Sequence, residues 1–174
     1  YVVAGGDMDG AIAGYRELTG KAVLLPKWAY GFWQSRERYK TQQELTGVLD
    51  EYRRRKLPID AIVLDWSYWP EDAWGSHDFD PANFPDPDGM VDHVHAQNAQ
   101  IMISVWPKFY PDTEHFKELD AAGFMYRRNI EVGERDWIGE GYLNSFYDPF
   151  SREAQAIFWR QVDAKLNRKG FDAW

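Results

Sequence analysis

The sequence of 174 residues contains no cysteine, which excludes disulfide bonds, zinc sites built on thiolates and catalysis by a thiol nucleophile. It also lacks long apolar runs: segments such as 22–25 and 61–64 are far shorter than the ~20 residues that cross a bilayer. Positive charge is scarce, since 20 Lys and Arg face 28 Asp and Glu, and the formal net charge of -8 would repel nucleic-acid phosphates. We therefore expect neither a membrane nor a nucleic acid as a partner.

Several motifs are absent as well. There is no Gly-x-Ser-x-Gly elbow for acyl transfer, and no phosphate-binding Gly-x-Gly-x-x-Gly follows the first expected strand. His93 and His95 are two residues apart and would point in different directions on a helix, so we expect no metal site and single out only His77, in a long loop.

Tyr1 stands where an initiator methionine would, so we expect the natural N-terminus upstream. The cellular compartment therefore stays open, and both the periplasm and the cell exterior are compatible with the sequence.

Aromatic residues, by contrast, are abundant. The 9 Trp, 10 Tyr and 10 Phe make up 17% of the chain, and many of them stand beside acidic or polar residues instead of in apolar runs. Flat rings next to hydrogen-bonding groups suit sugars, whose C–H faces stack on aromatics while their hydroxyls bond to carboxylates and amides. Filling a core is the commoner role for any single ring, but the composition as a whole favours a carbohydrate-binding surface.

Hydrophobic periodicity and capping residues predict that strands and helices alternate along most of the chain. The expected order is a helix at 9–19, a strand at 28–33, a helix after the cap Thr41, a strand at 59–66, a helix capped by Asp86, a strand at 101–106, a helix capped by Asp112, an inserted hairpin at about 124–147, a helix starting at Ser151 and a strand at 171–174. Such an alternation is typical of an α/β fold with a parallel sheet and right-handed crossovers.

The spacing of the four strands fits the first half of a (β/α)8 TIM barrel, and a small doubly wound sheet is the alternative. We expect residues 1–26 to be a lead-in segment from a preceding domain, and residues 27–174 to be the partial barrel. In a barrel, groups that contact ligands gather at the carboxyl ends of the strands. The sequence therefore directs attention to the residues that end each expected strand.

Three successive strand ends pair an aromatic residue with a polar one. These pairs are Trp33-Gln34, Asp65-Trp66 and Trp106-Pro107-Lys108. Together they match what a sugar pocket at the mouth of a barrel requires, although Asp65 could equally bind loop amides and Trp106 could fill the core under a loop. The candidate substrate-binding residues are thus Asp65, Trp66, Trp106 and Trp33.

Four motifs make the chain similar to glycoside hydrolase family 31 over nearly its whole length. They are Gly-Phe-Trp-Gln-Ser-Arg at 31–36, Leu-Asp-Trp-Ser-Tyr-Trp at 64–69, Phe-Pro-Asp-Pro-Asp-Gly-Met at 84–90 and Val-Trp-Pro-Lys at 105–108. Within the family, the chain most resembles α-xylosidases that act on xyloglucan fragments. The resemblance implies an α-xylosylated oligosaccharide as substrate, no cofactor, a bond from Asp65 to sugar hydroxyls and pocket walls formed by Trp66 and Trp106, with Trp33 as a further contact.

The resemblance also implies a retaining hydrolase, in which one carboxylate attacks the anomeric carbon and a second serves as acid and base. It places both carboxylates after Trp174, and Asp172 is not the nucleophile. We therefore expect no catalytic residue in this chain, no hydrolase activity from the 174 residues alone, and self-association through unpaired strand edges. An α-glucosidase of the same family and a non-catalytic carbohydrate-binding module are the alternatives.

Overall fold

The computed structural model describes residues 5–174, and the chain forms two compact units, Tyr1–Tyr30 and Gly31–Trp174. The first unit ends at residue 30, whereas the sequence analysis expects the lead-in segment to end at residue 26. Among the residues described, no helix is both long and apolar enough to cross a membrane. The four predicted pocket residues all belong to the second unit.

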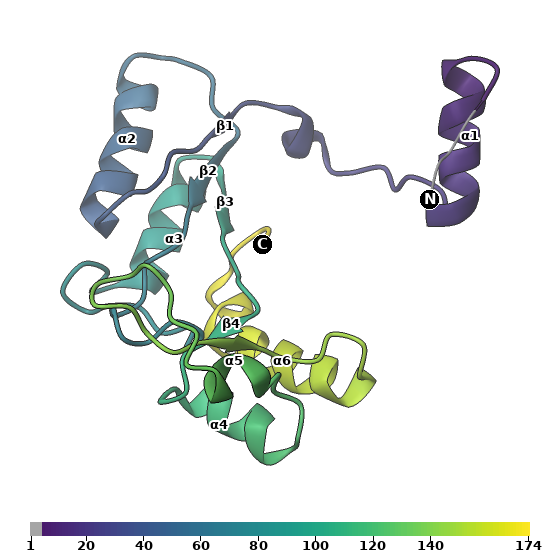
Figure 1. The fold of residues 1–174 in the computed structure, drawn as a ribbon. Helices are drawn as coiled ribbons and strands as arrows, with labels where there is room; N and C mark the ends of the chain where they lie inside the picture. The colour runs from purple at the N-terminus through teal and green to yellow at the C-terminus, as the bar shows by residue number, and fades with distance from the viewer. Residues whose placement is uncertain (1–4) are drawn as a thin grey trace. The chain divides into compact units, whose positions relative to one another are not determined.

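The first unit contains helix α1 (Met8–Thr19) and the 3-10 helix η1 (Lys27–Tyr30), both labelled or visible in Figure 1. Asp7 caps α1 through its side chain, and Gly20 ends the helix with a φ of +86°, so the helix predicted at 9–19 is confirmed. The strand predicted at 28–33 is wrong over most of its length, because these residues start with the turns of η1.

The second unit is built on a parallel sheet with the order β1-β2-β3 (Figure 1). Its strands are β1 (Trp33–Gln34), β2 (Ala61–Leu64) and β3 (Gln100–Ile103). Ala173 forms a parallel bridge with Met102, so the chain returns beside β3 where the sequence predicts the fourth strand, although only as a bridge. The parallel α/β architecture is confirmed.

Helices follow the strands, and side chains cap most of them as predicted. They are α2 (Gln42–Arg54) capped by Thr41, α3 (Pro87–Ala96) capped by Asp86, α4 (Glu114–Ala121) capped by Thr113 and α6 (Arg152–Lys165) capped by Ser151, followed by the 3-10 helix η2 (Asn167–Lys169). The prediction of Asp112 as the cap of α4 is wrong by one residue, because the Thr113 hydroxyl accepts from Phe116 N and also donates to the carbonyl of Tyr110.

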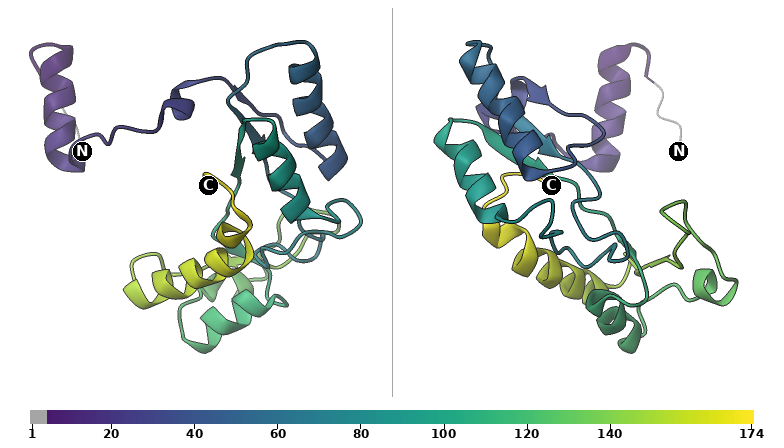
Figure 2. Two further views of the ribbon diagram at one scale, coloured as in Figure 1. Left: turned by 180° about the vertical axis from the view of Figure 1, so that it is seen from behind. Right: turned by 90° about the vertical axis from the view of Figure 1, so that its left-hand side faces the viewer.

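One face of the sheet is covered by α2 and α3, which lie side by side in both views of Figure 2. The core between these layers consists of fully buried aliphatic residues from all four elements. They include Leu45 and Leu49 of α2, Ile62 and Leu64 of β2, Val91 and Val94 of α3, and Ile101 and Ile103 of β3. This packing fixes the carboxyl ends of β2 and β3 next to each other.

The segment at 124–147 is more complex than a simple hairpin. It contains the short helix α5 (Arg128–Glu131), and its strand β5 (Ser145–Phe146) pairs antiparallel with β4 (Lys108–Phe109), which lies just beyond β3. A further antiparallel bridge joins Arg135 to Leu143. The segment thereby returns to the carboxyl end of the sheet, where Figure 1 also shows the long loop between β2 and α3.

Candidate functional site

The carboxyl ends of β2 and β3 are joined through the side chain of Asp65. Its Oδ1 accepts hydrogen bonds from the Ser104 hydroxyl at 2.7 Å and from the Trp66 backbone N–H at 2.8 Å. Both bonds go to the same oxygen, so they fix the orientation of the carboxylate without engaging Oδ2. Asp65 is half-buried at the strand end where barrel enzymes place their ligand-binding groups.

Trp74 brings the two predicted tryptophans of the pocket wall together. Its ring is 1% exposed, and its centroid lies 5.6 Å from that of Trp66 in a stacked arrangement and 5.3 Å from that of Trp106 edge-on. Trp69 packs on the same ring at 4.9 Å. The sequence places Trp74 in the β2–α3 loop but gives no sign that it is the buried centre of this cluster. Trp106 keeps 40% of its surface exposed beside it.

Trp33 lies at a different level of the sheet from the other three predicted residues. In the parallel register it stands opposite Ala61, which precedes Asp65 by four residues along β2. At a rise of ~3.3 Å per residue this is about 13 Å towards the amino end of the strand. The first strand ends at Gln34, one residue beyond its predicted end, and the backbone of Trp33 is level with Ala61 and not with Asp65. A contact between Trp33 and the substrate stays a prediction.

A buried ion pair packs against the tryptophan cluster. Lys108 Nζ is 2.5 Å from Asp136 Oδ2, and the two side chains are only 5% and 2% exposed. The same ammonium group sits 3.8 Å from the ring centroid of Trp74. Asp136 also accepts from the Tyr110 hydroxyl and from two backbone N–H groups of its own loop. The sequence predicts Lys108 at a strand end but not its partner.

The pKa of Asp136 reflects this environment. Burial raises the pKa of the carboxyl group, but the hydrogen bonds from Lys108 and Tyr110 and from the loop backbone outweigh burial, and the net pKa lies below its usual value. Asp136 is therefore ionised at neutral pH. Its charge is compensated by Lys108, as a buried carboxylate requires.

Gly75 allows the β2–α3 loop to approach β4 closely. Its φ is +91°, and a Cβ at this position would lie 2.5 Å from Cδ1 of Phe109 and 2.7 Å from the carbonyl oxygen of Lys108. Both contacts are shorter than packed atoms tolerate, and one of them is to backbone. The placement of Trp74 beside Lys108 therefore depends on a glycine at position 75.

We expect Gly75→Ala to destabilise the fold by about 2–4 kcal/mol, since a clash with β4 adds to the cost of the left-handed backbone. Gly123→Ala is the matched control, because Gly123 has a φ of +80° but a Cβ added to it would meet no atom within 4 Å. Gly123→Ala should lower the free energy of unfolding by only about 1–2 kcal/mol, the cost of a left-handed backbone for a residue with a Cβ. Denaturant unfolding of the full-length protein compares the two variants, and equal losses would contradict the close approach.

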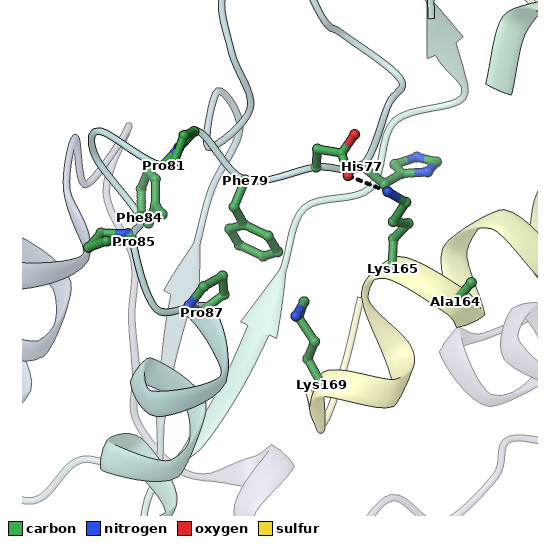
Figure 3. A pocket seen from close by; sticks show the side chains of 10 residues that line it. His77, Phe79, Pro81, Phe84, Pro85, Pro87, Ala164, Lys165 and Lys169 are labelled. Atoms are coloured by element: carbon green, nitrogen blue, oxygen red, sulfur yellow. Dashed lines mark hydrogen bonds and ion pairs between the residues drawn. The ribbon is translucent and has the colours of Figure 1, made fainter. Parts of the chain in front are cut away.

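A separate hollow of about 330 Å³ lies between the β2–α3 loop and α6 (Figure 3). Its lining includes His77, Asp78, Phe79, Lys165 and Lys169, and an ion pair of 2.5 Å joins Lys165 Nζ to Asp78 Oδ1 across it. None of the predicted pocket residues lines it. This hollow is therefore distinct from the site at the strand ends.

His77 is buried at the edge of that hollow, and neither ring nitrogen has a hydrogen-bond partner in the described part of the chain. Burial, together with the neighbouring His115 and Lys165, lowers the pKa of His77 to about 3, so the ring is neutral at physiological pH. Within residues 5–174, no group of three His, Cys, Asp or Glu side chains could hold a metal ion. His93 and His95 instead contact Asp50 and Asp172 separately.

The parallel strands and the helices that follow them define part of a (β/α)8 barrel, and the tryptophan cluster lies at the strand ends, where barrels bind their ligands. The chain belongs to glycosyl hydrolase family 31: the model of that family's TIM-barrel domain matches residues 22–174. The fold class and the family indicated by the sequence motifs are confirmed.

Three similar proteins are α-xylosidases. The chain is 44% identical, over all 174 residues, to an α-xylosidase of Saccharolobus solfataricus, of which it covers 22%. It is 74% identical to the solved family 31 α-xylosidase from Xanthomonas citri, with a TM-score of 0.92 over 95% of this chain and 18% of that one. For a soil-metagenome family 31 α-xylosidase complexed with xylose, the identity is 34% and the TM-score 0.79, over 90% of this chain and 23% of that one. The chain thus spans about a fifth of the length of these relatives.

Proposed function

We propose that the protein is an α-xylosidase that releases terminal α-linked xylose from xylosylated oligosaccharides, and that this chain forms part of the pocket for that xylose. The observation that carries the proposal is the oriented carboxylate of Asp65 beside the rings of Trp66 and Trp106. The names of the similar proteins support the same activity. The partner is a sugar substrate, and the reaction needs no cofactor.

Each group has a distinct role in this pocket. Asp65 Oδ2 accepts from sugar hydroxyls, while the bonds from Ser104 and Trp66 to Oδ1 hold the carboxylate in place. The rings of Trp66 and Trp106 bind the C–H faces of the sugar and limit the space around it. Xylose differs from glucose in lacking a hydroxymethyl group, so crowded walls favour the smaller sugar by about 1–3 kcal/mol.

The bond-breaking step needs two further carboxylates, about 5–5.5 Å apart in a retaining enzyme. We assign neither role to a residue of this chain. Asp172 does not qualify, because its Oδ2 accepts from the backbone N–H of Ile101 and contacts His95 Nε2 at 2.9 Å. Ile101 lies near the amino end of β3, opposite the edge where Asp65 lies. Asp172 therefore stabilises the sheet.

Kinetics of the full-length enzyme on an aryl α-xyloside and the matching aryl α-glucoside test the proposal. We expect kcat/KM to be at least about tenfold higher for the xyloside, the lower end of what one excluded carbon group provides. A preference for the glucoside would identify an α-glucosidase instead. Sugar binding without turnover of either substrate would identify a carbohydrate-binding protein, and each of these results would overturn the proposal.

A further inference from the structure

Trp137 is an exposed indole ring in a segment that is otherwise firmly held. It is 73% exposed, whereas the neighbouring Asp136 side chain is 2% exposed. Within this chain, a large apolar ring in this position gains little hydrophobic stabilisation. Exposed apolar surface of this kind marks sites that bind a ligand or a partner.

The backbone on both sides of Trp137 is fixed by the buried ion pair. Asp136 accepts from Lys108 Nζ, and its Oδ1 also accepts from the N–H groups of Ile138 and Tyr142 at 3.1 Å each. The Tyr142 ring stacks on that of Tyr110, with centroids 4.9 Å apart. The exposed ring is therefore positioned before any ligand arrives, which lowers the entropy lost on binding.

Trp137 belongs to the same aromatic cluster as the pocket wall. Its centroid lies 6.5 Å from that of Trp74, the buried ring that also contacts Trp106 at 5.3 Å. Lys108 Nζ lies 5.0 Å from the Trp137 centroid on the side of the cluster, and the rest of the ring faces solvent. Trp106 and Trp137 are thus two exposed rings that both contact the same buried ring, Trp74.

We propose that Trp137 is a stacking platform for the sugar unit that follows the terminal xylose, on the leaving-group side. The inference rests on the proposed function, because an enzyme that removes a terminal residue can bind further units only as part of the leaving group. The ring binds the C–H face of that unit. Trp137 thereby determines preference for oligosaccharides over xylosides with small leaving groups.

The test compares Trp137→Ala with the wild type in the full-length enzyme, using two substrates. One is the disaccharide of α-1,6-linked xylose and glucose, and the other is α-xylosyl fluoride, which has no second sugar. We expect kcat/KM on the disaccharide to fall about fivefold to tenfold, the effect of one lost aromatic stack, and kcat/KM on the fluoride to stay within about twofold. Trp137→Phe should retain most of the activity on the disaccharide.

Phe150→Ala is the matched control, because Phe150 is 92% exposed and makes no ring contact with the pocket cluster among the described residues. It should change neither rate. If Trp137→Ala lowered kcat/KM equally on both substrates, or did not lower it on the disaccharide, Trp137 would not be a stacking platform.

The glucosyl counterparts of both substrates separate this inference from the proposed function. A wild-type enzyme that hydrolyses only the glucosyl pair would refute the xylosidase proposal, and the Trp137 comparison would then be decided on that pair by the same criteria. A wild-type protein that hydrolyses none of the four substrates would refute both proposals.

Discussion

Replacement of Lys108 by methionine is expected to destabilise the domain by about 3–5 kcal/mol, because it leaves the Asp136 carboxylate buried without its counter-charge. The two side chains are 5% and 2% exposed, so water cannot take the place of the ammonium group. The loss should be largest in the segment at 124–147 and in the placement of Trp74, which Lys108 contacts at 3.8 Å. Denaturant unfolding of the full-length protein measures the change.

Two further variants show whether the loss of stability in Lys108→Met arises from burial of the ion pair. Lys117→Met removes a lysine from the exposed pair with Glu114, whose side chains are 54% and 87% exposed, and should cost less than about 1 kcal/mol. Lys108→Met combined with Asp136→Asn removes both buried charges and keeps an amide oxygen that accepts from the N–H groups of Ile138 and Tyr142, so it should recover much of the loss. If Lys108→Met were no more harmful than Lys117→Met, the buried ion pair would have no structural role.

The second large effect is expected from Asp65→Ala, which should lower kcat/KM on an aryl α-xyloside by about 10²-fold to 10⁴-fold. A hydrogen bond to a charged group contributes about 1.5–3 kcal/mol, and a carboxylate oxygen that accepts from two sugar hydroxyls would lose twice that amount. The fold should persist, since Asp65 is a half-buried strand-end residue outside the aliphatic core. Steady-state kinetics and a thermal melt of the same preparation test both statements.

Ser104→Ala separates positioning from direct binding at this carboxylate. It removes the 2.7 Å bond to Oδ1 but leaves the carboxylate itself, so the rate should fall only about tenfold or less. Asp78→Ala is the control for loss of an acidic residue, because Asp78 pairs with Lys165 at the separate hollow and should leave the rate unchanged. If Asp65→Ala and Asp78→Ala lowered kcat/KM by comparable factors, a substrate contact at Asp65 would be excluded.

The elements that could be predicted from the sequence are those determined by neighbouring residues. The helix α2 follows from Thr41, which accepts from Glu44 N, and from the apolar spacing of Leu45 and Leu49. The start of α3 follows from Asp86 and Pro87 in the same way. Capping and periodicity act over one or two turns, so a short stretch of sequence contains all the information they require.

The elements that could not be predicted depend on contacts between distant segments. Strand β4 pairs with β5 across the intervening residues 110–144, and Lys108 finds Asp136 only because of that pairing. Neither residue belongs to a local pattern, although a lysine between Trp106 and Phe109 in an otherwise apolar stretch is a signal that could have indicated burial. Long-range pairing and register are not encoded in local propensity.

In the candidate site, too, some residues could be predicted from the sequence and others could not. Asp65, Trp66 and Trp106 can be selected because each follows an apolar strand, and the structure brings all three to one edge of the sheet. Trp33 falls in the same group because the first strand ends beside it, at Gln34, but the register sets Trp33 level with Ala61. A strand of two residues gives too little alternation to define its end.

A crystal structure of the full-length enzyme with xylose bound would show whether this chain forms the wall of the pocket for a terminal xylose. We expect the sugar between Trp66 and Trp106, with a hydroxyl within about 3 Å of Asp65 Oδ2. Xylose bound elsewhere, such as in the hollow beside His77 and Lys165, with Asp65 making no contact to it, would rule out a xylose pocket at these residues.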